Sequence, residues 1–275
     1  MPVLVSSASG ANGNGYGTVL SFELNGRALG AFSDDSRVED PRGLSFDPTA
    51  GLLFVNSGTG RVLALDANGR VVRETVPIPG LNPGGGTFGP DRRYYVGSRS
   101  LRTILGFSVD LAAPPACLLP PGIVPFPRGF AFGVGGRLFL ASGIGPNGDG
   151  DESIETFAWG DTIRRRRLVH DPELSPLDLL LGPSGTILVS SECPFGSANA
   201  LTTVREYDPL EGRLLRVFSP GVRFRKPRGL RVGRDGLLYC VGEDEIVGFD
   251  LSSGKCVGSL LQWPRLNGQA LEFLP

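Results

Sequence analysis

The sequence contains a single histidine, His170, among its 275 residues. No C-x-x-C pair accompanies it, so the residues for a structural zinc site are missing. A nucleophilic serine or cysteine elsewhere in the chain would also lack an imidazole base, and no serine lies in a G-x-S-x-G turn. The sequence therefore identifies no catalytic residue.

Neither sign of charge dominates, and long apolar runs are missing. The 27 basic and 28 acidic residues give a formal net charge of −1, which excludes a global field for nucleic acid or an anionic membrane. There is no apolar run long enough for a membrane helix and no charged-then-apolar start typical of an export signal. We expect a soluble, cytoplasmic monomer whose partners are neither nucleic acid nor membranes.

One phrase, by contrast, is abundant. "PRGLSFDPTAGLLFVNS" begins at Pro41, "PRGFAFGVGGRLFLAS" at Pro127 and "PRGLRVGRDGLLYCVG" at Pro227, with weaker copies between them and a truncated copy at the end. The copies recur every 40 to 51 residues, which is the length of one four-stranded propeller blade. The anchors of the copies are Pro41, Pro83, Pro127, Pro176, Pro227 and Asn267.

Each repeat carries the signals of four short strands. Two apolar runs flank a Gly-rich turn, and a third run leads through a Gly-centred hairpin, as in "ALDANGRVVRE", to a fourth. We expect the Asn-Gly pairs to form two-residue turns in which both residues have positive φ. The last copy holds only a first strand, and residues 1–40 hold only the other three. The sequence thus predicts a six-bladed β-propeller over residues 1–275, in which residues 269–273 pair with the strand near residues 3–6.

The four cysteines are expected to be buried or half-buried free thiols. Cys240 and Cys256 fall on the second and fourth strands of one blade, about 10 Å apart, beyond disulfide reach. Free thiols fit a reducing compartment. The remaining two are Cys117 and Cys193.

The repeat resembles a known group. The unit P-x-G-[LIF]-x-[FV], followed by G-x-[LI]-[FYV]-V, is similar to the NHL repeat and to its relatives in the gluconolactonase (senescence-marker), paraoxonase and strictosidine-synthase-like superfamily of six-bladed propellers. The resemblance covers essentially the whole chain and implies the fold. It leaves the function open, because the superfamily includes calcium-dependent lactonases and esterases, an antibiotic lyase and binding domains without chemistry.

The resemblance also implies where a metal would lie. In the metal-dependent members, Glu, Asn and Asp at the starts of the innermost strands hold calcium at the channel mouth, and calcium requires roughly six to eight oxygens. Asp178 and Gln269 lie one residue beyond this register, with Asn82 and Asn267 nearby. The lyase-like members use a histidine, which this register lacks. The register itself holds Arg42, Gly84, Arg128, Leu177, Arg228 and Gly268.

The arginines of this register have two interpretations. Arg42, Arg128 and Arg228 belong to alternating blades and enter from one face, so three guanidinium groups around one mouth favour a carboxylate or phosphate. Alternatively, each arginine bonds the neighbouring blade and holds the ring together. Three long links, within residues 6–17, 142–153 and 191–203, are expected to rim the same face, either as binding loops or as tolerated insertions.

Two further motifs remain open. "PNGDGDES" places Asn147, Asp149 and Asp151 at the first, third and fifth positions of an EF-hand-type loop, but Ala158 stands where the bidentate glutamate belongs, so the alternative is a solvated acidic loop. The clusters "RRRR", from Arg164, and "RFRKPR", from Arg223, lack interleaved aromatics. We interpret them as solvated edges that discourage strand aggregation rather than as a surface for nucleic acid.

The sequence therefore predicts a propeller that binds a small, possibly anionic, ligand or a protein partner on its top face, without catalytic residues. The alternative is a calcium-dependent hydrolase of the lactonase or esterase type. The sequence identifies no certain cofactor, and calcium is the one candidate. The predicted ligand-binding residues are Arg42, Arg128, Arg228, Asp178 and Gln269, and the predicted metal ligands are Asn147, Asp149 and Asp151.

Overall fold

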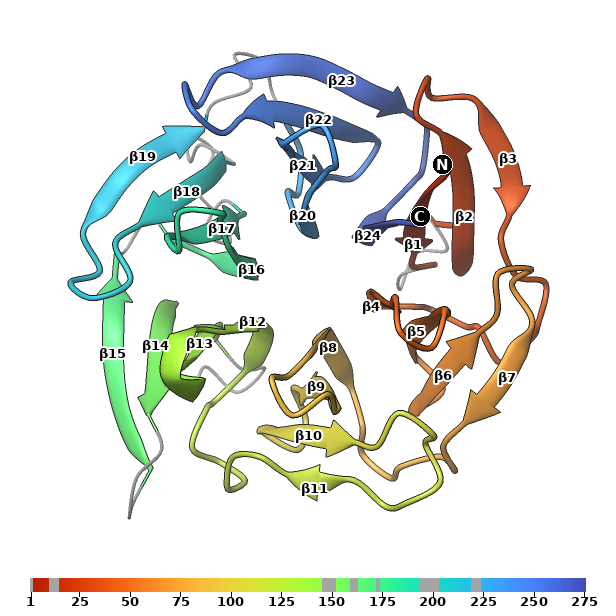
Figure 1. Cartoon of the computed structure of the whole chain (residues 1–275), viewed down its shortest axis with the longest axis horizontal. Coiled ribbons are helices and arrows are strands. Elements are labelled where there is room, and N and C mark those ends of the chain that lie inside the picture. The colour runs from red at the N-terminus through yellow and green to blue at the C-terminus, as the bar shows by residue number, and fades with distance from the viewer. Residues whose placement is uncertain are drawn as a thin grey trace.

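Six innermost strands surround one central axis in the computed structural model of the chain (Figure 1). The structure describes residues 2–9, 15–144, 152–158, 163–171, 174–192, 203–218 and 224–275. Five innermost strands begin at or just after a repeated proline, and the sixth begins after Asn267. They are β4 (Gly43–Asp47), β8 (Pro83–Phe88), β12 (Pro127–Phe132), β16 (Pro176–Leu181), β20 (Leu230–Val232) and β24 (Gly268–Phe273).

Each innermost strand begins a four-stranded antiparallel sheet, so the six-bladed β-propeller is confirmed. Blades one to five are β4–β7, β8–β11, β12–β15, β16–β19 and β20–β23, and blade six is β24 with β1–β3. The second strands are β1 (Pro2–Ser7), β5 (Leu52–Ser57), β9 (Tyr94–Ser98), β13 (Leu138–Ser142), β17 (Ile187–Ser191) and β21 (Leu237–Val241). The third strands are β2 (Thr18–Glu23), β6 (Arg61–Leu65), β10 (Thr103–Phe107), β14 (Ser153–Ala158), β18 (Thr203–Tyr207) and β22 (Glu245–Asp250).

The outermost strands are β3 (Ala28–Ala31), β7 (Val71–Glu74), β11 (Ala116–Cys117), β15 (Arg164–His170), β19 (Leu214–Phe218) and β23 (Cys256–Gln262). A 3-10 turn, Val134–Gly136, joins β12 to β13. Among the described residues, no helix has the length and apolar character needed to cross a bilayer.

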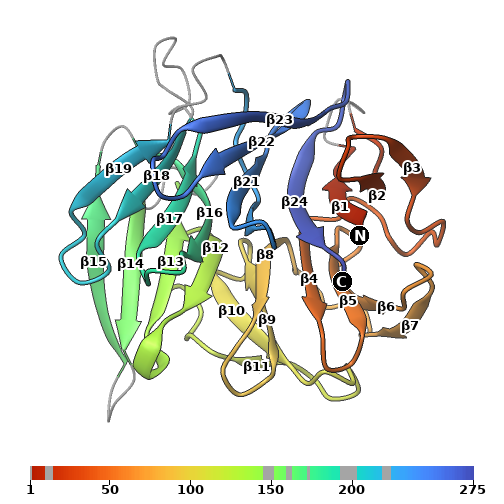
Figure 2. The same ribbon diagram turned by 45° about the horizontal axis from the view of Figure 1, so that its top comes forward.

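The ring closes where the two ends of the chain meet in blade six. β24 pairs antiparallel with β1, with Val3 opposite Phe273 and Val5 opposite Leu271. Figure 2 shows the two strands side by side, with both termini near them. The predicted pairing of residues 269–273 with residues 3–6 is confirmed, and it gives the inner edge of β1 a partner.

The core lies between blades rather than within one layer. Six clusters of buried apolar side chains each join two neighbouring blades; one of them packs Leu4 and Val19 of blade six against Leu44 and Leu53 of blade one. Strands buried on both faces account for the nearly continuous apolar runs in the repeats. The six interfaces form a rigid support for the residues around the axis.

The hairpins between third and fourth strands differ from the expected two-residue turns, in which both Asn and Gly have positive φ. Gly26 and Gly69 have positive φ angles of 84° and 77°, but Asn25 and Asn68 do not have positive φ. The chain instead makes a turn that ends in a left-handed glycine next to a β-bulge. Asp66, directly after β6, explains this turn, because its Oδ1 accepts hydrogen bonds from the N–H groups of Asn68 and Arg70 at 2.8 and 3.0 Å.

Blade two has an unusually short outermost strand. Only Ala116 and Cys117 pair with β10. Prolines flank this pair on both sides, at positions 114–115 and 120–121, and proline cannot donate to a ladder. The chain nevertheless passes along the outside of the blade (Figure 1).

Candidate functional site

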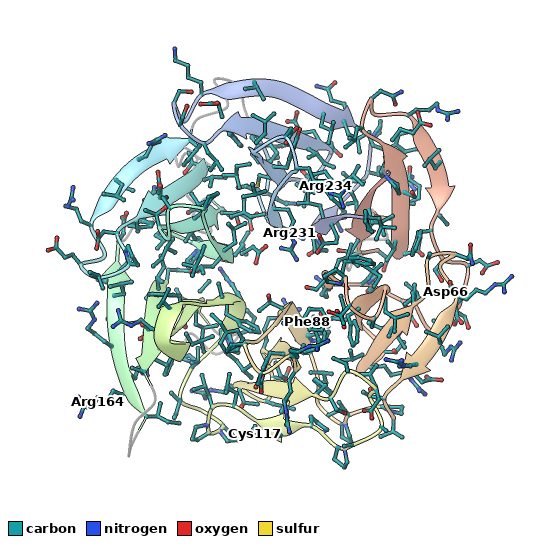
Figure 3. All side chains as sticks on the ribbon, in the orientation of Figure 1. Asp66, Phe88, Cys117, Arg164, Arg231 and Arg234 are labelled. Carbon is teal, nitrogen blue, oxygen red and sulfur yellow. The ribbon has the colours of Figure 1, made fainter. Side chains whose placement is uncertain are left out.

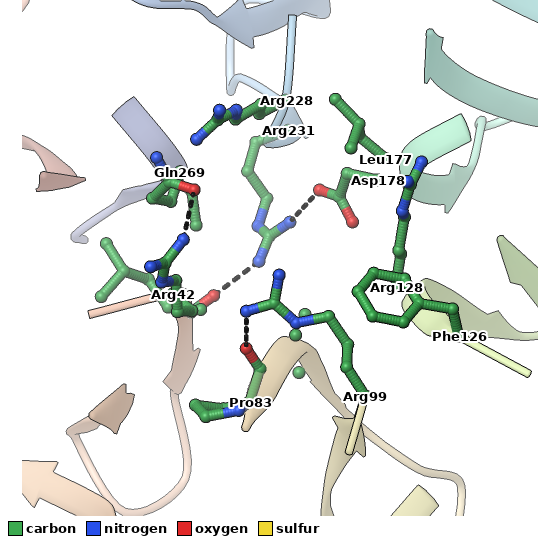
Figure 4. A pocket seen from close by; sticks show the side chains of 16 residues that line it. Arg42, Pro83, Arg99, Phe126, Arg128, Leu177, Asp178, Arg228, Arg231 and Gln269 are labelled. Atoms are coloured by element: carbon green, nitrogen blue, oxygen red, sulfur yellow. Dashed lines mark hydrogen bonds and ion pairs between the residues drawn. The ribbon is translucent and has the colours of Figure 1, made fainter. Parts of the chain in front are cut away.

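The starts of the innermost strands surround a pocket of about 180 Å³ at one mouth of the central channel (Figure 4). All five residues predicted from the sequence to bind a ligand line this pocket. They come from blades one, three, four, five and six, so only ring closure brings them together. These residues are Arg42, Arg128, Asp178, Arg228 and Gln269.

The backbone of the repeat explains why the arginines face the mouth. The N–H of Arg42 donates to Asn56 O at 2.9 Å, and the N–H of Arg228 donates to Val241 O at 2.8 Å. These bonds continue the pairing between first and second strands beyond the end of each ladder. The preceding proline has no N–H and a fixed φ, so the repeat fixes the arginine at the entry to each of these blades.

Arg42 and Arg228 have no carboxylate partner within the described part of the chain. Nη1 of Arg42 donates a long hydrogen bond of 3.4 Å to Gln269 Oε1. The Arg228 guanidinium makes no hydrogen bond or ion pair with any described residue. Burial lowers the pKa of Arg228, the charge of Glu192 partly opposes this, and Arg42 lowers it further. Two half-buried cations thus line the pocket without a carboxylate in direct contact among the described residues.

Arg128 is different, because it connects blade three to blade four. Its Nη1 donates to Pro176 O at 2.7 Å and to Ser175 Oγ at 3.4 Å, and it forms an ion pair with Glu152 Oε2 at 3.2 Å. Its guanidinium carbon lies 5.6 Å from the centre of the Phe126 ring. Burial lowers the pKa of Arg128 and the charge of Glu152 opposes this. For this arginine the interblade interpretation holds.

A fourth arginine, Arg99, lines the pocket and was missed from the sequence. It reaches the mouth from the link between β9 and β10, not from an innermost strand. Its Nη2 donates to Asn82 Oδ1 at 2.8 Å and to Pro83 O at 3.1 Å, whereas its buried Nε has no hydrogen-bond partner among the described residues. Burial, together with the charges of Arg42, Arg128 and Arg228, lowers the pKa of Arg99 to about 10. One indication of this position was present in the sequence: Arg99 lies in the short link between the second and third strands of its blade, and such links were expected on the face of the mouth.

A fifth arginine, Arg231, forms the floor of the pocket. Figure 3 shows its side chain in the central channel. Its guanidinium donates to Leu44 O at 2.6 Å and Leu230 O at 2.7 Å, and it pairs with Glu272 Oε2 at 3.2 Å and Asp178 Oδ2 at 3.8 Å. Burial lowers the pKa of Arg231, but the charges of Glu272 and Asp178 outweigh burial and raise it. One side chain therefore bridges blades one, four, five and six.

Two backbone N–H groups and Arg231 contact the carboxylate of Asp178. Its Oδ1 accepts a hydrogen bond from the N–H of Leu179, and its Oδ2 accepts one from the N–H of Leu230, both at 2.9 Å. Burial raises the pKa of Asp178, although Arg231 and these N–H groups act in the opposite direction. The carboxylate joins blade four to blade five, and its lone pairs are largely occupied.

These residues do not fit a calcium ion at the channel mouth. Five arginines line the pocket, and Arg231 engages the carboxylates of Asp178 and Glu272. A divalent cation needs several free oxygens and is repelled by guanidinium groups. The described residues contain no group of three or more His, Cys, Asp or Glu side chains that could hold a metal. The predicted ligands Asn147, Asp149 and Asp151 lie outside the described residues.

The other sequence features lie away from the axis. All four arginines from Arg164 to Arg167 are exposed on the outermost strand β15, and Figure 3 shows Arg164 on the outside of the ring. Arg165 and Arg167 reach Glu155 at 2.9 and 3.8 Å, whereas Arg166 bonds Leu210 O on the opposite side. This is the predicted alternation of an edge strand. His170 ends the same outermost strand.

The described cysteines are free, as predicted. Cys240 lies buried on β21 and Cys256 half-buried on β23, with β22 between them. The expected burial is wrong for Cys117, which is exposed on the outermost strand β11. Cys193 lies outside the described residues.

Fold and site together define a six-bladed β-propeller with an arginine-lined axial pocket, and solved structures share this fold. A protein of unknown function from Bacteroides caccae matches with a TM-score of 0.70 and 13% identity over 98% of this chain and 97% of its own. A gluconolactonase from Xanthomonas campestris matches with a TM-score of 0.62 and 19% identity over 82% and 76%. A streptogramin B lyase matches with a TM-score of 0.57 and 18% identity over 77% of this chain and 66% of its own, so the chain spans about two thirds of that lyase.

At these identities the likeness shows the fold alone. It agrees with the expected resemblance to gluconolactonase-type and lyase-type six-bladed propellers. No protein-family model and no curated protein sequence matches the chain.

Proposed function

We propose that the protein binds a small organic anion in the axial pocket. The observation that carries this proposal is that Arg42, Arg99 and Arg228 line one pocket without a carboxylate partner among the described residues. Guanidinium forks match carboxylate and phosphate geometry, and a desolvated pocket strengthens such bonds. Burial is the main cause of the lowered pKa of Arg99, and an anion would relieve the additional repulsion by Arg42, Arg128 and Arg228.

Arg128 and Arg231, at the same mouth, have the contacts expected of arginines with a purely structural role. Arg128 and Arg231 each have a carboxylate partner and at least one backbone carbonyl from another blade. Arg228 has neither, and Arg42 has only a long bond to an amide. This contrast supports a ligand-binding role for Arg42 and Arg228 rather than a role in holding blades together.

The pocket supports binding better than hydrolysis. Its lining includes no histidine, and its one carboxylate, Asp178, is occupied by two N–H groups and Arg231. Among the described residues that line the pocket, none therefore offers a free general base. The gluconolactonase and the lyase share the fold, but the residues around this axis give no support to their chemistry in this chain.

Sulfate tests the proposal because it stays doubly charged at all working pH values. Sulfate should raise the melting temperature of the wild-type protein, because a ligand that binds only the folded state stabilises it. At a sulfate concentration of about 100 times the Kd, the free energy of unfolding should increase by roughly 2.7 kcal/mol. Titration calorimetry should give a single site. The double variant Arg42→Gln/Arg228→Gln should lose this binding while keeping its fold.

The matched control is Arg164→Gln/Arg213→Gln, which removes the same charge from exposed sites. It should keep sulfate binding. If both double variants weaken binding equally, the effect is one of net charge, and the pocket is not the site.

A further inference from the structure

One side of the axial pocket carries apolar side chains. Phe126, directly before β12, and Leu177 of β16 both line the pocket and are half-buried. Neither belongs to the six apolar clusters that the described residues form between the blades. Figure 4 shows both on the side of the pocket opposite Arg42 and Arg228. A ligand bound to these two arginines therefore has apolar side chains beyond its charged group.

Blade two lines the pocket with bare backbone. Gly84, Gly85 and Gly86 follow one another in β8, and all three line the pocket. Gly84 occupies the register position that holds an arginine in blades one, three and five. Glycine in a strand allows a ligand to approach the backbone closely. A flat group can therefore lie against the peptide groups of this stretch, which we call the backbone wall.

The size and the charge of the pocket favour an aromatic ring as that flat group. A cavity of about 150 Å³ holds one benzene ring, and this pocket measures about 180 Å³. The face of an aromatic ring attracts guanidinium groups, whereas a saturated ring gains nothing from them. The pocket contains an example of this contact, since the guanidinium carbons of Arg99 and Arg128 each lie 5.6 Å from the centre of the Phe126 ring.

We propose that the ligand is a small aryl carboxylate, with one aromatic ring and one carboxylate. The carboxylate binds Arg42 and Arg228, and the ring lies against Leu177, Phe126 and the backbone wall. This rests on the proposed anion site and specifies the class of its ligand. A purely polar anion would satisfy the arginines but would leave the apolar side of the pocket in contact with water.

Matched pairs of carboxylates test the proposal. Calorimetry compares benzoate with cyclohexanecarboxylate and phenylacetate with cyclohexylacetate, and acetate supplies the charge without a ring. In at least one pair the aromatic acid should bind about tenfold more tightly than acetate, which corresponds to about 1.4 kcal/mol. It should also bind about threefold more tightly than its saturated partner, because only the aromatic ring attracts guanidinium groups.

A variant of the apolar side tests where the ring lies. Leu177→Asn should abolish most of the preference for the aromatic acid over acetate. Sulfate has no ring, so its binding reports whether the pocket of this variant is still folded. Arg42→Gln/Arg228→Gln should lose both sulfate and the aromatic acid, because both ligands use these arginines. The control Leu215→Asn, at an exposed leucine of β19, should change neither.

The outcomes separate the two proposals. If sulfate binds but neither aromatic acid gains over acetate, the aryl carboxylate is overturned and the anion site stands. Equal gains for the aromatic and saturated rings also overturn it, and they show a general apolar subsite instead. An undiminished preference in Leu177→Asn contradicts the assigned position of the ring. If neither sulfate nor any carboxylate binds the wild-type protein, both proposals fail.

Discussion

At the scale of single residues, the same repeat position serves different purposes in different blades. Arg42, Arg128 and Arg228 follow the same proline, yet only Arg128 is held by a carboxylate and by the neighbouring blade. The difference lies in the surroundings, because Glu152 and Ser175 are available only to Arg128. An identical motif therefore does not imply an identical role.

Arg231 should be a major contributor to stability. Arg231→Met leaves Asp178 and Glu272 without their cation in the channel, and breaking such a pair by removing one partner costs roughly 3 to 5 kcal/mol. Urea unfolding measures the loss. The triple variant that adds Asp178→Asn and Glu272→Gln removes the unpaired charges and should recover part of it. A single variant as stable as the wild type contradicts the assigned role.

Anion affinity should increase as the pH falls from 7 to 5. Burial raises the pKa of Glu152 above its ordinary value, with Arg128 partly opposing this. As the pH falls toward that raised pKa, Glu152 gains a proton and Arg128 loses its negative partner, so sulfate meets a more positive mouth. Calorimetry at several pH values measures the slope. Glu152→Gln should bind sulfate tightly already at pH 7 and show a flatter profile; an equally steep profile would assign the effect to other groups.

At the scale of strands, the innermost layer depends on the close approach of neighbouring blades. A Cβ on Gly129 of β12 would lie 2.6 Å from the Cα of Asp178 on β16, and 2.3 Å from its Oδ1. No side chain fits between these strands. The glycines that follow Arg128 and Arg228 are thus required by close packing against the backbone of the next blade.

Gly129→Ala should therefore destabilise the protein by about 3 kcal/mol, the upper range for overpacking a tight core. Gly182→Ala is the control, since its nearest neighbour is the flexible end of Leu188 at 3.2 Å. Thermal unfolding should separate the two variants by several degrees. Equal melting temperatures would show that β12 and β16 can move apart without loss.

The strands were predictable from the sequence to a greater extent than the site. Repeated prolines and turn glycines report local backbone geometry, so the six innermost strands and the closing pair of β24 and β1 follow from them. Arg99 was missed because it enters the mouth from a link between strands. Arg231 was missed because its partners belong to three other blades. Contacts between distant blades leave no local signal.

At the scale of the whole molecule, stability depends on closure of the ring. Deleting residues 267–275 removes β24 and exposes the inner edge of β1 and one face of Leu271's cluster. The melting temperature should fall sharply. Adding a synthetic peptide of residues 266–275 should restore part of it, because the vacated position accepts the same strand. A truncated protein that melts at the wild-type temperature is incompatible with this closure.

The pairing of β24 with β1 also affects how the protein is made. β24 completes blade six and leaves the ribosome after the other strands that the structure describes, so the inner edge of β1 stays unpaired until β24 has been synthesised. Until then the axial mouth is incomplete, because Gln269 is missing from its lining and Arg231 lacks its partner Glu272. Ligand competence is therefore expected to arise in one late step of biogenesis.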